Sequence, residues 1–190
     1  QRRLRTLGRK MMPDLVRLQS TWRVLRHNDF VMTRKLGLRD GPRLVVLGRE
    51  VPQDGLPVQT NPDWVEDSQL VTRLLEDHPE TQIVYQPHGS MAGNKALLSK
   101  IEKLSKRVRL IEANYDVSEL ALVVDAFHTV DSPFGLAALL TGKPVTVYGT
   151  PSYGGLGLTQ DLDAQGDPRP LLVTRAIDLA LFVGWYFTQN

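Results

Sequence analysis

The sequence has 190 residues, 42% of them hydrophobic and 23% charged, which is the composition of a globular chain with enough apolar material for a sizeable core. It contains no cysteine, which excludes a disulfide framework and a thiolate metal site and favours a reducing cytoplasm. No apolar run reaches the roughly 18 residues of a membrane span, and the N-terminus lacks the apolar core of a signal peptide. We therefore expect a chain that neither spans a membrane nor carries its own export signal.

The net charge of +2 conceals an asymmetry between the two ends of the chain. Residues 1–43 hold twelve Lys or Arg and three acidic residues, whereas residues 44–190 hold eleven bases and eighteen acids. In the first part, apolar residues recur at helical spacing, and Pro13 is expected to kink or split the helix. A basic helical arm of this kind, residues 1–42, suits anionic lipid headgroups or nucleic-acid phosphate. The alternative is a helix that packs its apolar stripe on the body.

Peripheral contact with the inner membrane through residues 1–40 is thus one expectation for the arm. Nucleic acid is not an expected partner, because the body is acidic and aromatic and basic residues do not alternate along it. The four histidines are dispersed and form no His-x-Glu pattern, so no metal site is expected.

From residue 43 onward, strand and helix patterns alternate. Short apolar runs rich in β-branched residues predict buried parallel strands at 44–47, 83–85, 108–111, 126–129 and 145–148. Helical patterns lie between them, at about 64–77, 92–105, 117–124 and 133–141. This order predicts an α/β domain over 43–190, a Rossmann-like parallel sheet of about five strands with helices on both faces. Residues 150–170 are predicted to form a long, functional loop before a last helix at about 173–188.

Two segments lie where a predicted strand ends and a helix begins, which is where open α/β sheets bind nucleotides. They are Gln86-Pro-His-Gly89 and His128-Thr-Val-Asp-Ser-Pro-Phe-Gly135. His88 can donate a hydrogen bond or, when protonated, offer a charge to a phosphate. Ser132 precedes a proline at the expected first helical position, and a helix cap shares the geometry of an anion site. The structural alternatives are a satisfied histidine and a cap on a core helix.

Three blocks taken together resemble a known family. They read Gln86-Pro-His-Gly89, His128-Thr-Val-Asp-Ser-Pro-Phe-Gly-Leu-Ala-Ala-Leu-Leu-Thr-Gly-Lys-Pro-Val145 and Tyr148-Gly-Thr-Pro-Ser-Tyr-Gly-Gly-Leu-Gly-Leu-Thr-Gln-Asp161. Over roughly residues 43–162, their order is similar to that of the capsular polysaccharide synthesis and export family. Members of this family include the retaining β-Kdo glycosyltransferases of the KpsC and LipB kind. The last block is the most specific part, because nothing generic requires it.

The resemblance implies a retaining glycosyltransferase, or a module of one, that uses CMP-Kdo as donor substrate without a further cofactor. It implies two Rossmann-like halves in a GT-B-like arrangement, with this chain as the C-terminal, donor-binding half. Asp54 would be the nucleophile, since a carboxylate can form and release the covalent intermediate that retention requires. Without the resemblance, Asp54 is a turn residue in Pro-Gln-Asp-Gly.

The remaining site residues also follow from the resemblance. His88 and Ser132 would hold the CMP phosphate, and the loop that contains Tyr153 would close over the donor. The candidate donor- and phosphate-binding residues are His88, Ser132, Glu50, Asp131, Tyr153, Gly154 and Gly155.

The chain also departs from the family pattern. In the family's Lys-Pro-His-Pro motif, this chain has Gln86 in place of the lysine and Gly89 in place of the second proline. In the family's Thr-Ser pair, it has Asp131 in place of the threonine, followed by Ser132. An aspartate beside a phosphate is unfavourable by roughly 1 kcal/mol or more. The alternative function is therefore a non-catalytic, diverged binding module in a capsule polysaccharide synthesis or export assembly.

The chain, at 190 residues, is shorter than a transferase built from two halves, which bears on the partners we expect for it. A transferase with two halves needs about 300 residues, two domains of ordinary size, and before residue 43 this chain offers only the arm. The acceptor half is expected on the same longer chain or on a partner. The expected partners are a nucleotide sugar and a glycan or glycolipid acceptor, at a cytoplasmic location peripheral to the inner membrane.

Overall fold

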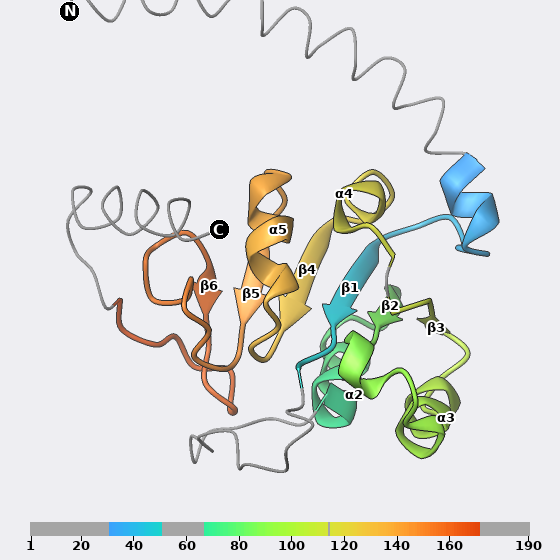
Figure 1. The fold of residues 1–190 in the computed structure, drawn as a ribbon, viewed down its shortest axis with the longest axis horizontal. Helices are drawn as coiled ribbons and strands as arrows, with labels where there is room; N and C mark the ends of the chain where they lie inside the picture. The colour runs from blue at the N-terminus through green and yellow to red at the C-terminus, as the bar shows by residue number, and fades with distance from the viewer. Residues whose placement is uncertain (1–30, 51–66, 114, 172–190) are drawn as a thin grey trace, which may run out of the picture. The chain divides into compact units, whose positions relative to one another are not determined.

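The computed structural model describes residues 31–50, 67–113 and 115–171 (Figure 1). The chain divides into two units, residues 1–39 and 40–190. In the first unit, residues 31–35 are helical. The rest of the predicted basic arm, Asp54 and the predicted helix at 173–188 lie outside the described residues. Within the described part of the chain, no helix combines the length and the apolar character that crossing a bilayer requires.

The second unit contains a sheet of six parallel strands in the order β3-β2-β1-β4-β5-β6. The strands are β1 (Arg43–Leu47), β2 (Gln82–Gln86), β3 (Val108–Leu110), β4 (Ala126–Thr129), β5 (Val145–Val147) and β6 (Gln160–Asp161). In this sheet β2 and then β3 lie on one side of β1, whereas β4, β5 and β6 follow one another on its other side. The direction in which strands are added therefore reverses between β3 and β4. This is the doubly wound order of Rossmann-like folds, and it confirms the predicted α/β class.

Helices cover both faces of this sheet. They are α2 (Asp67–Asp77), α3 (Lys95–Lys103), α4 (Val117–Leu120) and α5 (Phe134–Leu140), with a short 3₁₀ helix η1 (Gly89–Met91). Because crossovers between parallel strands are right-handed, the reversal of strand order places α2 and α3 on one face and α4 and α5 on the other. Accordingly, α2 contacts α3, and α4 contacts α5, which lies against β4 and β5 (Figure 1).

The core lies between the central strands and their covering helices. All five residues of β2 are buried, as are four of the five residues of β1. Such continuous burial is typical of parallel strands covered on both faces. Leu70 and Leu74 of α2 belong to the same buried cluster as Val46 of β1 and Ile83 of β2. The apolar spacing along α2 therefore reflects its contact with the sheet.

The predicted elements differ from the observed ones mainly at their ends. Helix α3 begins at Lys95 because the side chain of Asn94 accepts a hydrogen bond of 3.1 Å from the backbone N of Leu97, which makes Asn94 its cap. Helix α4 ends at Leu120, and α5 begins at Phe134, one residue later than predicted. Strand β6 was not predicted, since its two residues carry no apolar run and are fixed by pairing with β5.

Candidate functional site

The candidate site lies where the strand order reverses between β1 and β4. Open α/β sheets bind ligands in the crevice at the carboxyl ends of their strands at such a reversal. Residues 48–50 leave β1 there, 87–90 leave β2, 130–132 leave β4 and 149–155 follow β5. Four loops therefore meet at one edge of the sheet. They carry every candidate site residue that the structure describes.

His88 follows β2 and is half-buried. Its Nδ1 accepts a hydrogen bond of 3.2 Å from the backbone N of Ser90 and lies 2.9 Å from the Ser90 Oγ. Because Nδ1 accepts from an N–H group, the proton of the neutral ring is on Nε2. The histidine thus caps η1 with one nitrogen and keeps a donor on the other.

The ring of His88 also lies beside the segment that follows β4. Its centroid is 5.5 Å from that of Phe134, the first residue of α5. Phe134 is two residues beyond Ser132, so the two segments singled out in the sequence meet in the structure. This contact is the basis for treating them as one site.

Ser132 is completely buried, and its N, Oγ and carbonyl oxygen each make a hydrogen bond. Its N donates to Thr129 Oγ1 at 2.9 Å, and its Oγ accepts a long hydrogen bond of 3.4 Å from the N of Phe134. The Thr129 hydroxyl in turn donates to the carbonyl of Leu47 at 2.9 Å, which links β4 to β1. Helix α5 begins one residue later than predicted, so Pro133 directly precedes it, but the Ser132 Oγ still accepts from the N of Phe134, as expected of a cap.

Tyr153 fastens the loop after β5 to this turn. Its hydroxyl donates a hydrogen bond of 2.6 Å to the carbonyl of Ser132, and the side chain is buried. A Cβ at Gly135 would collide with the Tyr153 phenol, so the absence of a side chain there makes room for the tyrosine. Tyr153 therefore points inward as an anchor. The next residues, Gly154 and Gly155, are buried against Asp161.

The loop after β1 passes close to the end of β2. The N of Gly48 donates to the carbonyl of Gln86 at 2.7 Å. A Cβ at Gly48 would lie 2.9 Å from both the N of His88 and the hydroxyl of Tyr85, closer than real Cβ atoms approach. Only glycine permits this approach, which brings the segment leading toward Asp54 alongside His88.

A buried carboxylate that the sequence reasoning did not single out supports the same loop. Asp67 Oδ2 accepts hydrogen bonds from the Tyr85 hydroxyl at 2.9 Å and from the backbone N of Arg49 at 3.3 Å. Its Oδ1 is buried and has no hydrogen-bond partner among the described residues. Burial raises the pKa of Asp67, against the lowering effect of these donors. The available signal was an acidic residue in the first turn of a helix that has one apolar face.

Arg49 was also missed, and it changes the electrostatics around Asp131. Asp131 is half-buried, and burial raises the pKa of its carboxyl, while Arg49 lowers it and the exposed Glu50 raises it further. The aspartate thus lies within the field of a guanidinium. The negative charge of Asp131, which the sequence analysis expected to disfavour a phosphate, is therefore offset by the guanidinium of Arg49.

Gln86, which stands where the family has a lysine, binds the loop that follows β3. It is buried, and its Nε2 donates to the carbonyls of Ala113 at 3.2 Å and Tyr115 at 2.7 Å. Gln86 therefore holds the segment between β3 and α4. No group of three side chains able to hold a metal ion occurs in the described ranges 31–50, 67–113 and 115–171.

Comparison with known proteins identifies the family. Residues 63–178 match the family model described as capsule polysaccharide biosynthesis protein. The chain belongs to this family. The match contains all three sequence blocks that indicated the resemblance, which is thereby confirmed, and it begins after Asp54.

Two curated relatives of this capsule polysaccharide biosynthesis chain are bacterial proteins. The lipopolysaccharide-processing protein LpsZ of Rhizobium meliloti is 30% identical over 132 residues, covering 69% of this chain and 30% of LpsZ. The capsule polysaccharide modification protein LipA of Neisseria meningitidis serogroup B is 30% identical over 120 residues, covering 63% of this chain and 17% of LipA. The chain thus spans less than a third of either relative.

A solved structure with a similar fold is that of KpsC from Thermosulfurimonas dismutans, described as a β-Kdo 2,7 transferase. It superposes with a TM-score of 0.52 and 25% identity, covering 84% of this chain and 53% of that one. The chain therefore has the α/β fold of about half of a GT-B-like glycosyltransferase. This confirms the predicted fold class.

Proposed function

We propose that this chain is the donor-binding part of a retaining glycosyltransferase that transfers Kdo from CMP-Kdo in the synthesis of a bacterial capsule or surface polysaccharide. The observation that carries the proposal is the meeting of His88 with the Ser132 turn where the strand order reverses. Family membership and the similarity to a β-Kdo transferase support it. The donor nucleotide is the only small molecule that the proposal requires, with no cofactor besides it.

In this proposal the phosphate lies at the carboxyl ends of β1, β2 and β4. His88 donates from Nε2, and Arg49 supplies the positive charge. Asp131 contributes a carboxyl whose charge Arg49 offsets. Glu50 lies at the exposed rim of the same loop.

The proposed chemistry has two displacements. The Asp54 carboxylate attacks the anomeric carbon of Kdo, the bond from that carbon to the CMP phosphate breaks, and CMP leaves with the electron pair. An acceptor hydroxyl then attacks the same carbon, releases the carboxylate and gives its proton to a base. Two inversions give net retention.

The acceptor and the rest of the enzyme lie beyond this chain in the proposal. The chain matches 53% of the KpsC transferase structure, which supports a second half on the same longer polypeptide or on a partner. That half would bind the glycan or glycolipid acceptor. Peripheral contact of residues 1–40 with the cytoplasmic face of the inner membrane remains part of the proposal.

Calorimetric titration with CMP and CMP-Kdo tests donor binding. The wild-type chain is expected to bind CMP, and His88→Ala to weaken binding about tenfold or more, because a hydrogen bond to a charged group is lost. His78→Ala is the matched control, since His78 is exposed and lies at the end of α2. Failure of the wild-type chain to bind CMP would refute the proposal.

Intact mass spectrometry tests the nucleophile. After exposure to CMP-Kdo without acceptor, wild-type protein should gain the mass of one Kdo residue, and Asp54→Asn should gain none. An adduct of equal yield on both proteins would remove Asp54 from the mechanism.

A non-catalytic binding module is the second candidate. The observation that favours it is the buried amide of Gln86, which holds carbonyl groups where the family has a lysine. This candidate predicts CMP binding without an adduct or turnover, even when the complementary half is supplied.

A further inference from the structure

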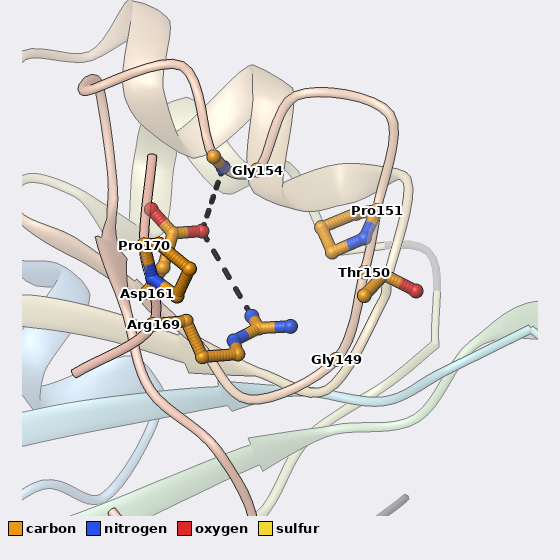
Figure 2. Close-up of a pocket in the computed structure, with 8 residues that line it drawn as sticks. Gly149, Thr150, Pro151, Gly154, Asp161, Arg169 and Pro170 are labelled. Carbon is orange, nitrogen blue, oxygen red and sulfur yellow. Dashed lines mark hydrogen bonds and ion pairs between the residues drawn. The ribbon is translucent and has the colours of Figure 1, made fainter. Parts of the chain in front are cut away.

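A cavity of about 210 Å³ lies beside the loop after β5, and His88 does not line it. Its lining includes Thr150, Pro151, Gly154, Asp161, Arg169 and Pro170. Figure 2 shows Thr150 and Pro151 on one side of the hollow and Asp161, Arg169 and Pro170 on the other. The cavity is smaller than the roughly 300–1,000 Å³ of pockets that hold a whole drug-sized ligand, so it suits one ring of a larger molecule.

The carboxylate in this cavity is fixed by the loop around it. Asp161 Oδ1 accepts a hydrogen bond of 2.8 Å from the N of Gly155, and Oδ2 accepts one of 3.0 Å from the Thr159 hydroxyl. A Cβ at Gly154 would lie 3.0 Å from Oδ1, so glycine allows the loop to lie directly on the carboxylate. With both oxygens engaged, Asp161 holds the loop and Arg169 in place.

The guanidinium of Arg169 is incompletely satisfied. Its Nη2 lies 3.9 Å from Asp161 Oδ1 and donates a long hydrogen bond of 3.4 Å to the carbonyl of Val147, while its buried Nε has no partner among the described residues. Buried donors are normally hydrogen-bonded. Figure 2 shows the other terminal nitrogen turned toward Thr150 and Pro151 across the hollow. The terminal nitrogen that faces the hollow can therefore donate to a hydrogen-bond acceptor on a ligand.

The nearby carboxylate decides the charge of that ligand. Asp161 and Arg169 carry opposite charges, so the pair attracts an anion less than a lone arginine would. Pro151 and Pro170 add apolar surface suited to the face of a flat ring. A flat, uncharged ring with hydrogen-bond acceptors on its edge fits these conditions.

We propose that this cavity binds the pyrimidine base of the donor nucleotide, with Arg169 donating hydrogen bonds to the acceptors on the ring edge. The inference rests on the proposed function, because it assumes a nucleotide whose phosphate lies at His88. It adds a subsite for the base and a residue that determines which base is accepted.

The chemistry of the guanidinium predicts a preference between pyrimidines. Arginine recognises pairs of adjacent acceptors, as on the edge of guanine, through two parallel N–H groups. Cytosine presents such a pair in O2 and N3, whereas N3 of uracil carries a hydrogen and is a donor. CMP should therefore bind about tenfold or more tightly than UMP.

Titration of the full chain with CMP, UMP and ribose 5-phosphate tests this subsite. Arg169→Gln is expected to weaken CMP binding at least tenfold, to remove the difference between CMP and UMP, and to leave ribose 5-phosphate binding unchanged. His88→Ala should weaken binding of all three. Equal loss of CMP and ribose 5-phosphate binding in Arg169→Gln would overturn the base subsite.

A second variant tests the cavity without touching the ion pair. Thr150 lies exposed at the cavity, so Thr150→Trp should fill the hollow and weaken CMP binding, while Ser152→Trp on the same loop is the matched control. CMP binding by Thr150→Trp equal to that of wild type would place the base elsewhere and leave the proposed function standing. If wild-type chain binds none of the three ligands, the proposed function fails, and the base subsite fails with it.

Discussion

The hydroxyl of Tyr85 in β2 donates a hydrogen bond of 2.9 Å to Asp67 at the start of α2, and both residues are buried. The same carboxylate oxygen accepts from the backbone N of Arg49, and the Tyr85 hydroxyl lies against Gly48. The pair therefore determines where the loop after β1 leaves the sheet. That loop leads to Asp54 and passes beside His88.

Tyr85→Phe should lower the free energy of unfolding by about 1–3 kcal/mol, because a buried carboxylate loses a donor. The hydrogen bond favours the charged carboxylate, so the loss should grow as pH rises above the ordinary carboxyl pKa of 3.8. Urea unfolding at several pH values measures both effects. Tyr148→Phe is the matched control, since its hydroxyl has a longer contact of 3.2 Å with the neutral ring of His128. An equal, pH-independent cost in the two variants would contradict this role.

His128 should make the fold sensitive to acid. Burial lowers the pKa of His128 from 6.5 to about 4, with a smaller contribution from His78. Between these two values the unfolded chain binds a proton that the folded chain does not. Stability should thus be fully present above pH 6.5 and fall as pH drops toward 4, by about 3 kcal/mol at most.

His128→Gln isolates this effect from that of the carboxylates. The difference in unfolding free energy between wild type and this variant should change through the same pH window, in favour of the variant at low pH. His78→Gln, at an exposed position, should keep most of the wild-type slope. If the unfolding free energies of wild type and His128→Gln change in parallel from pH 6.5 to 4, His128 is protonated as readily in the folded chain as in the unfolded chain.

Gly135→Ala should dislodge the loop after β5. The added methyl would overlap the Tyr153 phenol, whose hydrogen bond to the Ser132 carbonyl fastens that loop. We expect a loss of about 1–3 kcal/mol from overpacking, measured by thermal unfolding. Gly93→Ala is the control, because a Cβ at Gly93 would meet nothing within 4 Å. If both variants unfold at the same temperature as wild type, Tyr153 does not anchor the loop.

Much of this fold was predictable because buried parallel strands appear in the sequence as continuous apolar runs. The run at residues 83–85 predicted β2 to within one residue at each end. Strand β6 carries no such signal, since Gln160 and Asp161 are polar. They are held in place by pairing with β5 and by contacts of the Asp161 side chain, which only the tertiary structure shows.

The site was predictable in part, for a related reason. The position of His88 after a strand follows from the apolar pattern, but the roles of Asp67 and Arg49 depend on α2 meeting the loop after β1. The sequence shows that Gln86 replaces the family's lysine, but only the structure shows that its side chain binds the carbonyls after β3. Chain order alone does not show which way the last residue of a strand points.

Arg107 should stabilise the end of α2 from a distant part of the sequence. Its Nη1 donates to the carbonyls of His78 and Thr81, each at 2.8 Å, and its Nη2 donates to that of Leu75 at 2.7 Å. The last turn of α2 has no basic residue of its own, and Arg107 places a guanidinium against the carbonyls at this helix end.

Arg107→Ala should therefore cost about 1–3 kcal/mol of unfolding free energy in urea, given that three hydrogen bonds are replaced by bonds to water. Arg107→Lys should recover only part of the loss, because one ammonium group cannot span the three carbonyls. Lys106→Ala, at the exposed neighbouring position, should change stability by less than about 0.5 kcal/mol. Full recovery by lysine would mean that charge near the helix end, and not the three hydrogen bonds, is what stabilises α2.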